Sequence, residues 1–393
     1  MDPIINPFSP GAGAPPPELV GREDILTSAN VLIKRLERGF PVQSVILTGL
    51  RGVGKTVLLG EVRRMAAQTK VIPIHIEATE ERSLSALLVA PLKKTLFELD
   101  RQRGAKEKVK RSLMALRNFI GTVKVEMGDF GLEIEPQHGI ADSGDLAFDL
   151  GELLATVAEA AQEKQQGVLL ILDEIQYLGE KDLDALIMAM HRMQQDSLPM
   201  ALFAAGLPFL PGLTGNVKSY AERLIHFQTV GALSAEDSAK AIREPFAEAK
   251  VELTDEAAAC IHAKTQGYPY FLQAWGYQLW NAVDASPIFA EAVEAVTPKV
   301  LQRLDESFFR VRMERMTNAE KEFVFAMAEV PGPTPKVSEI AARLHINMSS
   351  LGPRRSALIK KGMIYSPSHG TLAFSVPLFG DYLNRHRAQR LTP

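Results

Sequence analysis

The stretch that decides the fold is residues 44–59, SVILTGLRGVGKTVLL. Apolar runs flank a central segment, Gly49–Thr56, that fits the pattern G-x-x-x-x-G-K-[ST]. This order predicts a buried strand, a glycine-rich loop and a helix, an arrangement that binds phosphate through backbone N–H groups and a helix N-terminus. An ordinary glycine-rich turn is the alternative, but it does not need the strand before the loop and the helix after it.

Each residue type in this loop has a predicted role. Gly49 and Gly54 are expected to adopt backbone conformations that residues with a Cβ avoid, so that N–H groups can approach a phosphate closely. Lys55 is expected to reach the β- and γ-phosphates, and the Thr56 hydroxyl to bind Mg²⁺. The predicted nucleotide-binding residues of the loop are Gly49, Leu50, Arg51, Gly52, Val53, Gly54, Lys55, Thr56 and Val57.

A second informative stretch is residues 167–174, GVLLILDE, which reads as a buried parallel strand that ends in two acids. Asp173 is expected to complete the Mg²⁺ shell, and Glu174 to orient or activate the attacking water. A strand that merely ends at a polar surface is the alternative. Together with the loop, these acids predict an enzyme that binds a nucleoside triphosphate and Mg²⁺ and hydrolyses the γ-phosphate. The absence of an Asn-Lys-x-Asp guanine string favours ATP, so that slow hydrolysis would give ADP and phosphate.

Strands and helices alternate over residues 19–230, which predicts the α/β class: a parallel P-loop NTPase sheet flanked by helices, with the ligand at the carboxyl ends of the strands. Pro73 lies within the strand expected at 70–76, so that strand is expected at an edge or a bulge. Residues 122–135 alternate around Gly128-Asp129 and predict a hairpin insertion at about 120–136.

The remaining regions differ in pattern. Residues 1–18 are rich in proline and glycine and are expected to form a flexible tail. Residues 231–297 predict an all-α lid, and 298–316 a linker helix. Residues 317–393 show the order helix, helix, turn, helix, hairpin, which is that of a winged helix-turn-helix domain.

The charge is unevenly distributed. The net charge is −3, yet residues 298–393 hold 15 Lys and Arg against 8 Asp and Glu, which leaves 29 against 39 for the rest. The third helix of the C-terminal region has no acid, and the residues expected to contact nucleic-acid phosphates are Arg354, Arg355, Lys360 and Lys361. Winged helices also dock proteins, which is the alternative. The basic residues at 106–117 predict a solvated helix face, with a nucleic-acid contact as the lesser alternative.

Composition sets the broad class. A hydrophobic fraction of 46% and a charged fraction of 23% are ordinary for a globular protein. The single cysteine, Cys260, excludes an internal disulfide and a cysteine-based zinc site, which suits the reducing cytoplasm. The N-terminus lacks the basic region of a signal peptide, and no 18-residue apolar run predicts a membrane span. A cytoplasmic protein with no membrane partner is therefore expected.

With these motifs, the chain resembles the AAA+ ATPases, above all the archaeal-type, origin-recognition-like group and the related STAND switch ATPases. Val20-Gly21-Arg22-Glu23 looks like that group's N-terminal box, which implies that Val20 and Gly21 lie beside the adenine. Gly267-Tyr268-Pro269-Tyr270 resembles the Gly-x-Pro lid motif of STAND proteins, which implies that Pro269 abuts the nucleotide. A turn or a helix start is the alternative for both.

Some positions depart from the family pattern. The strand that ends at Ala205-Gly206 lacks the polar sensor residue, and no second sensor arginine can be assigned. Arg223 follows the last sheet strand, where the family places a finger that acts on the neighbouring subunit, so the resemblance implies a nucleotide-dependent homo-oligomer. A surface ion pair is the alternative for Arg223, and Arg51 is a weaker candidate for the finger.

The sequence therefore predicts an ATP-dependent switch whose nucleotide state, ATP or ADP, controls a winged helix that contacts double-stranded DNA or a DNA-bound protein. The alternative is a signalling scaffold in which ATP drives oligomerisation and the winged helix binds protein. A small-molecule kinase is a third reading, which the separate lid and winged domains disfavour.

Overall fold

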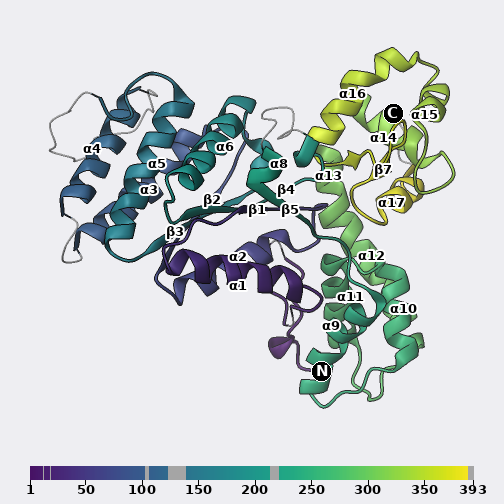
Figure 1. The fold of residues 1–393 in the computed structure, drawn as a ribbon. Helices are drawn as coiled ribbons and strands as arrows, with labels where there is room; N and C mark the ends of the chain where they lie inside the picture. Colours follow the sequence, from purple (N-terminus) through teal and green to yellow (C-terminus); the bar gives the residue numbers. More distant parts are fainter. Residues whose placement is uncertain (12, 18, 102–105, 123–138, 213–220, 388–393) are drawn as a thin grey trace. The chain divides into compact units, whose positions relative to one another are not determined.

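The computed structural model describes residues 1–387 except 12, 18, 102–105, 123–138 and 213–220 (Figure 1). The predicted hairpin insertion falls almost wholly on residues 123–138 and so lies outside the described residues. The chain divides into two compact units. The first comprises Met1–Arg22, Leu50–Gly54 and Gly231–Pro393, and the second comprises Glu23–Gly49 and Lys55–Val230.

The second unit is built on a five-stranded parallel sheet in the order β2-β3-β4-β1-β5. Its strands are β1 (Ser44–Thr48), β2 (Val71–Glu77), β3 (Gly167–Asp173), β4 (Met200–Gly206) and β5 (Ile225–Thr229). The strands β3 and β4 are buried along their whole length, as expected for central strands covered on both faces. The predicted α/β class with a parallel sheet is therefore confirmed, and Pro73 lies on the edge strand β2.

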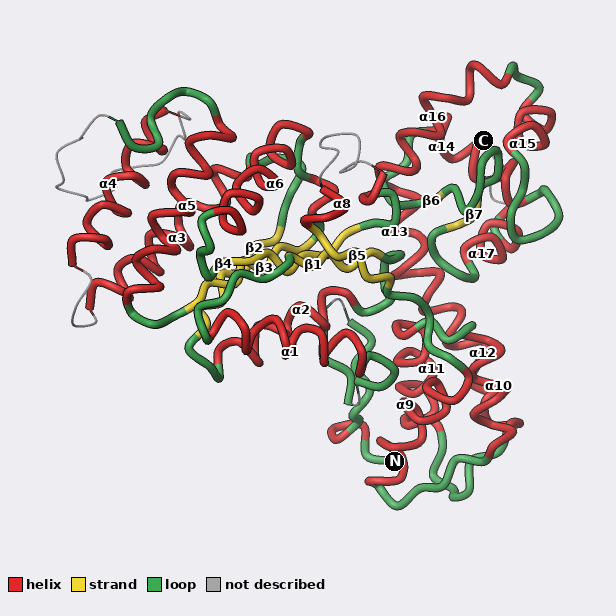
Figure 2. Tube along the Cα trace, viewed as in Figure 1, coloured by secondary structure: helices red, strands yellow, loops and turns green. Residues whose placement is uncertain are grey.

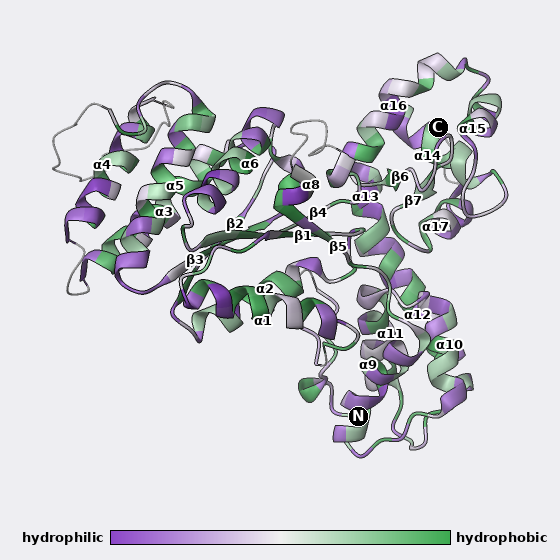
Figure 3. Ribbon diagram, in the orientation of Figure 1, coloured by the Kyte–Doolittle hydropathy of each residue, from purple (hydrophilic) through white to green (hydrophobic). Residues whose placement is uncertain are grey.

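Helices cover both faces of this sheet (Figure 2). On one face lie α1 (Glu23–Glu37) and α2 (Lys55–Ala67); on the other lie α3 (Leu84–Arg101), α4 (Lys106–Thr122), α5 (Leu146–Glu163) and α6 (Glu180–Gln195). The short helix η2 (Ile175–Tyr177) follows β3, and the short helix α8 (Ala221–Leu224) precedes β5. Figure 3 colours the chain by hydropathy. The inner strands β1, β3 and β4 consist mostly of apolar residues and are buried, whereas the outer strands β2 and β5 also carry polar residues. No helix in the described part of the chain is long and apolar enough to span a membrane.

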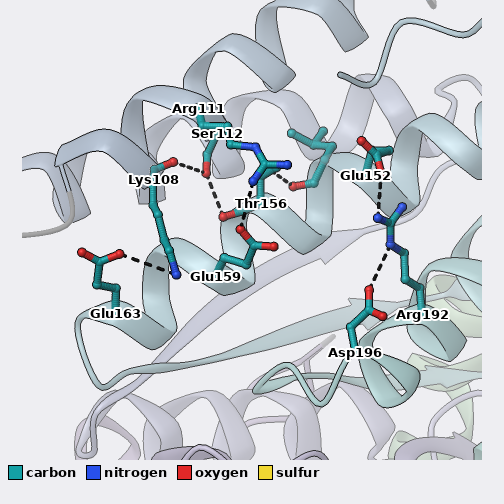
Figure 4. A network of polar contacts seen from close by, with 10 residues as sticks. Lys108, Arg111, Ser112, Glu152, Thr156, Glu159, Glu163, Arg192 and Asp196 are labelled. Carbon is teal, nitrogen blue, oxygen red and sulfur yellow. Dashed lines mark hydrogen bonds and ion pairs between the residues drawn. The ribbon is translucent and has the colours of Figure 1, made fainter. Parts of the chain in front are cut away.

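Ion pairs join α4, α5 and α6 on the outer side of this layer (Figure 4). The pairs are Lys108–Glu163 at 3.6 Å, Arg111–Glu159 at 3.5 Å and Arg192–Glu152 at 2.6 Å. The Ser112 hydroxyl also donates to the Thr156 carbonyl at 2.8 Å. Two cations of the basic stretch at 106–117 are thus paired with acids of α5, which favours a solvated, ion-paired helix face over a nucleic-acid contact.

In the first unit, the region after Gly231 is helical, as predicted for a lid. It contains α9 (Ala235–Glu248), α10 (Asp255–Thr265), α11 (Pro269–Ala282) and α12 (Ala290–Arg303), followed by the π-helical turn η3 (Leu304–Phe309) and α13 (Arg310–Glu314). The predicted boundary between lid and linker at 297/298 falls inside α12. Pro298 suggested a helix start, but the structure accommodates it within a continuous helix.

The C-terminal region contains α14 (Asn318–Ala328), α15 (Val337–Leu344), α16 (Met348–Lys360), the antiparallel pair β6 (Ile364–Tyr365) and β7 (Ala373–Phe374), and α17 (Phe379–Arg385). Thr317 and Glu320 form a capping box that starts α14. The order of three helices and a hairpin is the one that the sequence predicts. The final helix α17 was not predicted; its Phe379, Tyr382 and Leu383 are buried.

The prediction of a flexible tail at residues 1–18 is wrong for the part that contains Phe8. This side chain is 1% exposed and packs against the rings of Phe246 and Trp280, with centroids 5.2 and 6.5 Å away. A Cβ at Gly276 would come within 2.4 Å of the Phe8 ring, so this glycine on α11 makes room for it. The Trp280 indole also donates to the Asp2 carbonyl at 2.8 Å. One aromatic side chain thus anchors a segment whose composition suggested disorder.

We predict that Phe8→Ala destabilises the lid by about 3–5 kcal/mol, the usual loss for a large aromatic side chain removed from a core. The only tryptophans of the chain, Trp275 and Trp280, both lie on α11, so their fluorescence during urea unfolding reports on this region. Ile4→Ala is the control, because Ile4 is 91% exposed in the same segment. Equal midpoints for Phe8→Ala and the wild type would contradict the anchor.

Candidate nucleotide-binding site

The glycine-rich loop lies between β1 and α2, as predicted. Gly52 and Gly54 have φ values of +88° and +97°, a region that residues with a Cβ rarely adopt. Gly49 is not among the glycines with positive φ, so its role differs from the predicted one. Its N–H donates to the Gly206 carbonyl at 3.1 Å, which fastens the start of the loop to the end of β4.

Lys55 is the first residue of α2 and is only 6% exposed. Its ammonium donates to the Gly49 carbonyl at 2.8 Å, which holds the side chain back along the loop. The N–H groups at the start of α2 and the helix dipole favour an anion at the same place. The positive charge of Lys55 also bears on the Asp173 carboxyl, whose pKa it lowers.

A short hydrogen bond joins the loop helix to the central strand. The Thr56 hydroxyl donates to Asp173 Oδ2 at 2.6 Å, at the point where β3 ends. Burial raises the pKa of the Asp173 carboxyl above its usual value, while the hydrogen bond from Thr56 acts in the opposite direction. The structure therefore brings together the two residues that the sequence predicts as metal ligands.

These two oxygen atoms fit Mg²⁺, which prefers hard oxygen ligands and is usually held by few protein groups together with phosphates and water. Within the described residues, no group of three or more His, Cys, Asp and Glu side chains could hold a metal. A magnesium ion at Thr56 and Asp173 would thus depend on the phosphates of a nucleotide for its further ligands.

Glu174 follows Asp173 in a left-handed backbone conformation, with φ +53° and ψ +38°. This conformation is strained for a residue with a Cβ, and such strain is concentrated at functional sites. The Glu174 carboxylate accepts a hydrogen bond from the side-chain amide of Gln176. The backbone N–H of Glu174 donates to Asp173 Oδ1 at 2.8 Å. Gln176, which the sequence did not single out, is 5% exposed and lies in η2.

Gly206, at the end of β4, has no side chain and so leaves space for the Gln176 side chain. A Cβ at this position would come within 2.8 Å of Gln176 Oε1 and 2.3 Å of Leu210 Cδ1. The sequence indicated only that a polar sensor residue is missing at Gly206. In the structure, the amide of Gln176 occupies the space beside this glycine and reaches Glu174.

In the first unit, Leu50–Gly54 packs with the lid. Tyr268 is 2% exposed, and its ring would lie 2.8 Å from a Cβ at Gly52, so only glycine fits there. A Cβ at Gly267 would come within 2.1 Å of the Leu233 carbonyl oxygen, which fixes the start of the lid motif. Pro269 is the first residue of α11, and it is Tyr268, quoted with the motif but not predicted as a site residue, that lies against the loop.

The predicted N-terminal box also lies in this unit. Val20 is buried, and Gly21 has a φ of +68° with the Asp237 carboxylate 2.7 Å from where a Cβ would stand. Arg22 was not predicted as a functional residue. Its guanidinium donates to the Val53 carbonyl at 3.3 Å and the Gly231 carbonyl at 2.6 Å, which ties the loop to the start of the lid.

The other predicted residues are separate from this cluster. Arg223 lies on α8 in the second unit and is exposed. Of the four cations predicted to contact nucleic acid, Lys361 pairs with the buried Glu320 at 2.7 Å and Arg354 lies 3.8 Å from Glu322. Arg355 is partly buried, and Lys360 is exposed.

Comparisons with known proteins identify two regions of similarity. Residues 18–203 match the family model described as AAA ATPase domain, and residues 306–383 match a domain of unknown function (DUF8462). The comparison with curated proteins finds no significant match.

One solved structure supports the same fold over nearly the whole chain. The Walker-type ATPase PABY2304 of Pyrococcus abyssi is 18% identical with a TM-score of 0.54, covering 96% of this chain and 99% of that one. Weaker likeness is found to the Aeropyrum pernix Orc1 protein in complex with DNA (18% identity, TM-score 0.47, 96% of each chain) and to the Thermotoga maritima RuvB Holliday junction branch migration motor (15% identity, TM-score 0.42, 95% of this chain and 96% of that one). Residues 18–203 are thus similar to an AAA ATPase domain, and the PABY2304 structure supports the P-loop fold.

We predict that Asp173→Asn raises or preserves the melting temperature while it weakens Mg²⁺-dependent nucleotide binding. The pKa of Asp173 is higher in the folded protein than in the unfolded chain. The free energy of unfolding therefore falls as the pH rises from the unfolded-state pKa through the folded-state pKa. At neutral pH the ionised carboxylate thus costs stability. Asparagine can still accept the hydrogen bond from Thr56 but lacks the charge. A clearly lower melting temperature for Asp173→Asn at pH 7 would contradict this description of the buried carboxylate.

Proposed function

We propose that the protein is an ATP-binding switch ATPase of the AAA+ type, related to the origin-recognition-like and STAND groups, with a C-terminal winged helix that contacts double-stranded DNA. The observation that carries the proposal is the 2.6 Å hydrogen bond from Thr56 to Asp173. It brings the phosphate-binding loop and the acidic strand end, which stand 117 residues apart in the sequence, into one site.

In this proposal the loop N–H groups, the start of α2 and Lys55 bind the phosphates of ATP. Mg²⁺, held through Thr56 and Asp173, supplies positive charge to the phosphates. Glu174 orients the attacking water and accepts its proton, while ADP and phosphate are the products. Since the amide of Gln176 already holds the Glu174 carboxylate, this carboxylate must turn toward the water first, which agrees with slow hydrolysis.

The proposal extends to assembly. Arg223 is exposed on α8, which precedes β5, so this arginine does not follow the last strand of the sheet as predicted. An arginine in such a place could reach the nucleotide of a neighbouring copy and stabilise the charge that develops on the phosphates. We therefore include a nucleotide-dependent homo-oligomer, with Arg223 acting between subunits, in the proposed function.

The C-terminal part of the proposal rests on the order of elements and on α16. Three helices followed by the β6–β7 hairpin are the parts of a winged helix, in which the third helix enters the major groove. Arg354, Arg355, Lys360 and Lys361 on and after α16 would contact DNA phosphates, with Lys360 the most accessible in the described structure. The charge balance of residues 298–393 favours the same partner.

A second candidate, an ATP-dependent scaffold whose winged helix binds protein, is favoured by two observations. Lys361 and Arg354 pair with acids of α14, so part of the predicted DNA-binding charge is already neutralised. Met348, the first residue of α16, is 57% exposed, and an exposed methionine suits an adaptable protein contact.

Nucleotide handling is tested with two variants. Lys55→Ala is expected to lose most ATP binding, because the buried ammonium is the principal side-chain charge on the phosphates. Glu174→Gln is expected to bind ATP as the wild type does but to lose at least about 100-fold in turnover, the usual contribution of a general base. Filter binding and phosphate release measure the two effects.

Lys34→Ala is the matched control, since Lys34 is an exposed cation of the same unit that pairs with Glu37. Retained ATP binding by Lys55→Ala would remove the loop from the site. Undiminished phosphate release by Glu174→Gln would instead remove only Glu174 from its role.

DNA binding is tested through its salt dependence. The double variant Arg354→Glu/Lys360→Glu is expected to weaken double-stranded DNA binding and to reduce the slope of log K against log salt by about 2, one for each lost phosphate contact. Lys361 is left unchanged, because its ion pair with Glu320 supports the fold. Lys299→Glu, an exposed change on α12, is the control. If the double variant binds DNA with the slope of the wild type, the scaffold is favoured.

A further inference from the structure

The N-terminal segment, residues 2–9, lies along α11 within the first unit, and this contact has no role in the function described so far. Its contacts on α11 come from one set of residues, which we call the α11 stripe: Gln273, Gly276, Tyr277, Trp280 and Asn281. The spacing i, i+3, i+4, i+7, i+8 places these residues on one face of the helix. A single helix face therefore contacts the segment from Asp2 to Ser9.

Phe8 is the apolar anchor of the segment. Its buried ring packs against Phe246 and Trp280, whose own rings stack at 5.7 Å. The three atoms nearest to a Cβ built at Gly276 all belong to the Phe8 ring. Glycine is unfavourable inside a helix compared with alanine, and Gly276 is not among the glycines with positive φ. The contact with Phe8 is therefore the reason for a glycine at this position.

Asn6 adds polar contacts to this anchor. Its side-chain oxygen accepts from the Phe8 N–H at 3.0 Å, which closes a turn over Pro7. Its side-chain amide donates to the Tyr277 carbonyl at 3.2 Å and to Asn281 Oδ1 at 3.1 Å. The sequence Asn6-Pro7-Phe8 thus forms one compact turn that meets α11 with an amide and a ring.

The main chain of the segment is bound at both ends. The Ser9 N–H donates to Gln273 Oε1 at 3.2 Å, and the Trp280 indole donates to the Asp2 carbonyl at 2.8 Å. The side chains of Ile4 and Ile5, in contrast, are 91% and 65% exposed. Recognition therefore depends on the asparagine, the phenylalanine and the main chain, and the segment runs antiparallel to α11.

The stretch that follows the segment does not fix it to its own copy. Residues 10–17 consist only of proline, glycine and alanine, and those that the structure describes form neither a helix nor a strand. Such a stretch has little apolar surface to bury. Exchange of an identical element between two copies would reproduce the same contacts at low cost.

We propose that the α11 stripe is a peptide-binding site for the Asn-Pro-Phe turn, and that a second copy of the chain supplies this turn, so that residues 2–9 link two copies. Within one copy, the tether gives the segment an effective concentration on the order of millimolar, so the intramolecular contact dominates in dilute protein. In an assembly, the segment of a neighbouring copy is also held at a high local concentration. This link involves no residue of the nucleotide site and goes beyond the proposed function.

The first test mixes two full-length variants in the absence of nucleotide and measures association by analytical ultracentrifugation. Phe8→Ala has an α11 stripe that accepts a segment but lacks the anchor on its own segment. Gly276→Ala keeps the anchor, but its new Cβ stands within 2.4 Å of where the Phe8 ring must lie. The mixture is expected to form a dimer in which the segment of Gly276→Ala binds the stripe of Phe8→Ala. Each variant alone is expected to lack this dimer.

The second test uses a labelled synthetic peptide with the sequence of residues 1–10. Phe8→Ala is expected to bind it, with a change in the tryptophan fluorescence of α11, and the wild type at least about tenfold more weakly, because its own segment competes. Replacing the phenylalanine of the peptide is expected to weaken binding at least about tenfold, and replacing its asparagine severalfold. The peptide with Ile4→Ala is the control and should bind unchanged, since Ile4 is exposed.

The outcomes decide both parts of the proposal. If Phe8→Ala does not bind the peptide, the peptide-binding site is overturned. If it binds the peptide, but the mixed variants associate no more than each variant alone, the second copy is overturned as the source of the segment. If Phe8→Ala does not fold, Asn6→Ala replaces it in both tests with the same criteria. Because no nucleotide is present, a failure of the proposed ATP binding leaves these results unaffected.

Discussion

The hydrogen bond between the Thr56 hydroxyl and the Asp173 carboxylate is the contact on which the candidate site depends. The strand order makes it possible: β4 lies between β1 and β3, so the carboxyl ends of the two strands are separated by one strand. That strand ends in Gly206, which has no side chain to occupy the gap and whose carbonyl accepts from Gly49. The parallel sheet, the glycine and the buried acid together define one edge where phosphates and a metal ion can be held.

Groups that are costly in a folded protein occur in both units. Glu174 has a strained backbone, and burial raises the pKa of Asp173. In the other unit the Tyr268 hydroxyl is buried with no hydrogen-bond partner among the described residues, and burial lowers the pKa of Arg312. Clusters of strained or perturbed groups are typical of sites that bind a charged ligand, because selection for binding overrides local stability.

The sequence predicts the parts of this protein that local patterns encode. The loop glycines, Lys55, and the two acids after an apolar strand are contiguous motifs, and the edge position of β2 follows from Pro73 alone. The order of the C-terminal helices could also be read from hydrophobic periodicity and caps. These features need no knowledge of which segments meet in space.

Contacts between distant segments could not be predicted in this way. Phe8 fits against Gly276, a position 268 residues later, so a composition that suggested disorder was misleading. Gln176 is recognisable as a partner of Glu174 only once Gly206 is seen to leave space for it. The contact of Lys361 with Glu320, which comes from another helix, could not be predicted from local sequence either. In each case the contact depends on which distant residue the fold places next to the side chain.

The most direct test of the account is an experimental structure of the protein with Mg²⁺ and a non-hydrolysable ATP analogue. The account predicts that the phosphates lie along Leu50–Thr56 and that the metal contacts both the Thr56 hydroxyl and the Asp173 carboxylate. A nucleotide bound elsewhere, or a metal ion that touches neither residue, would contradict it.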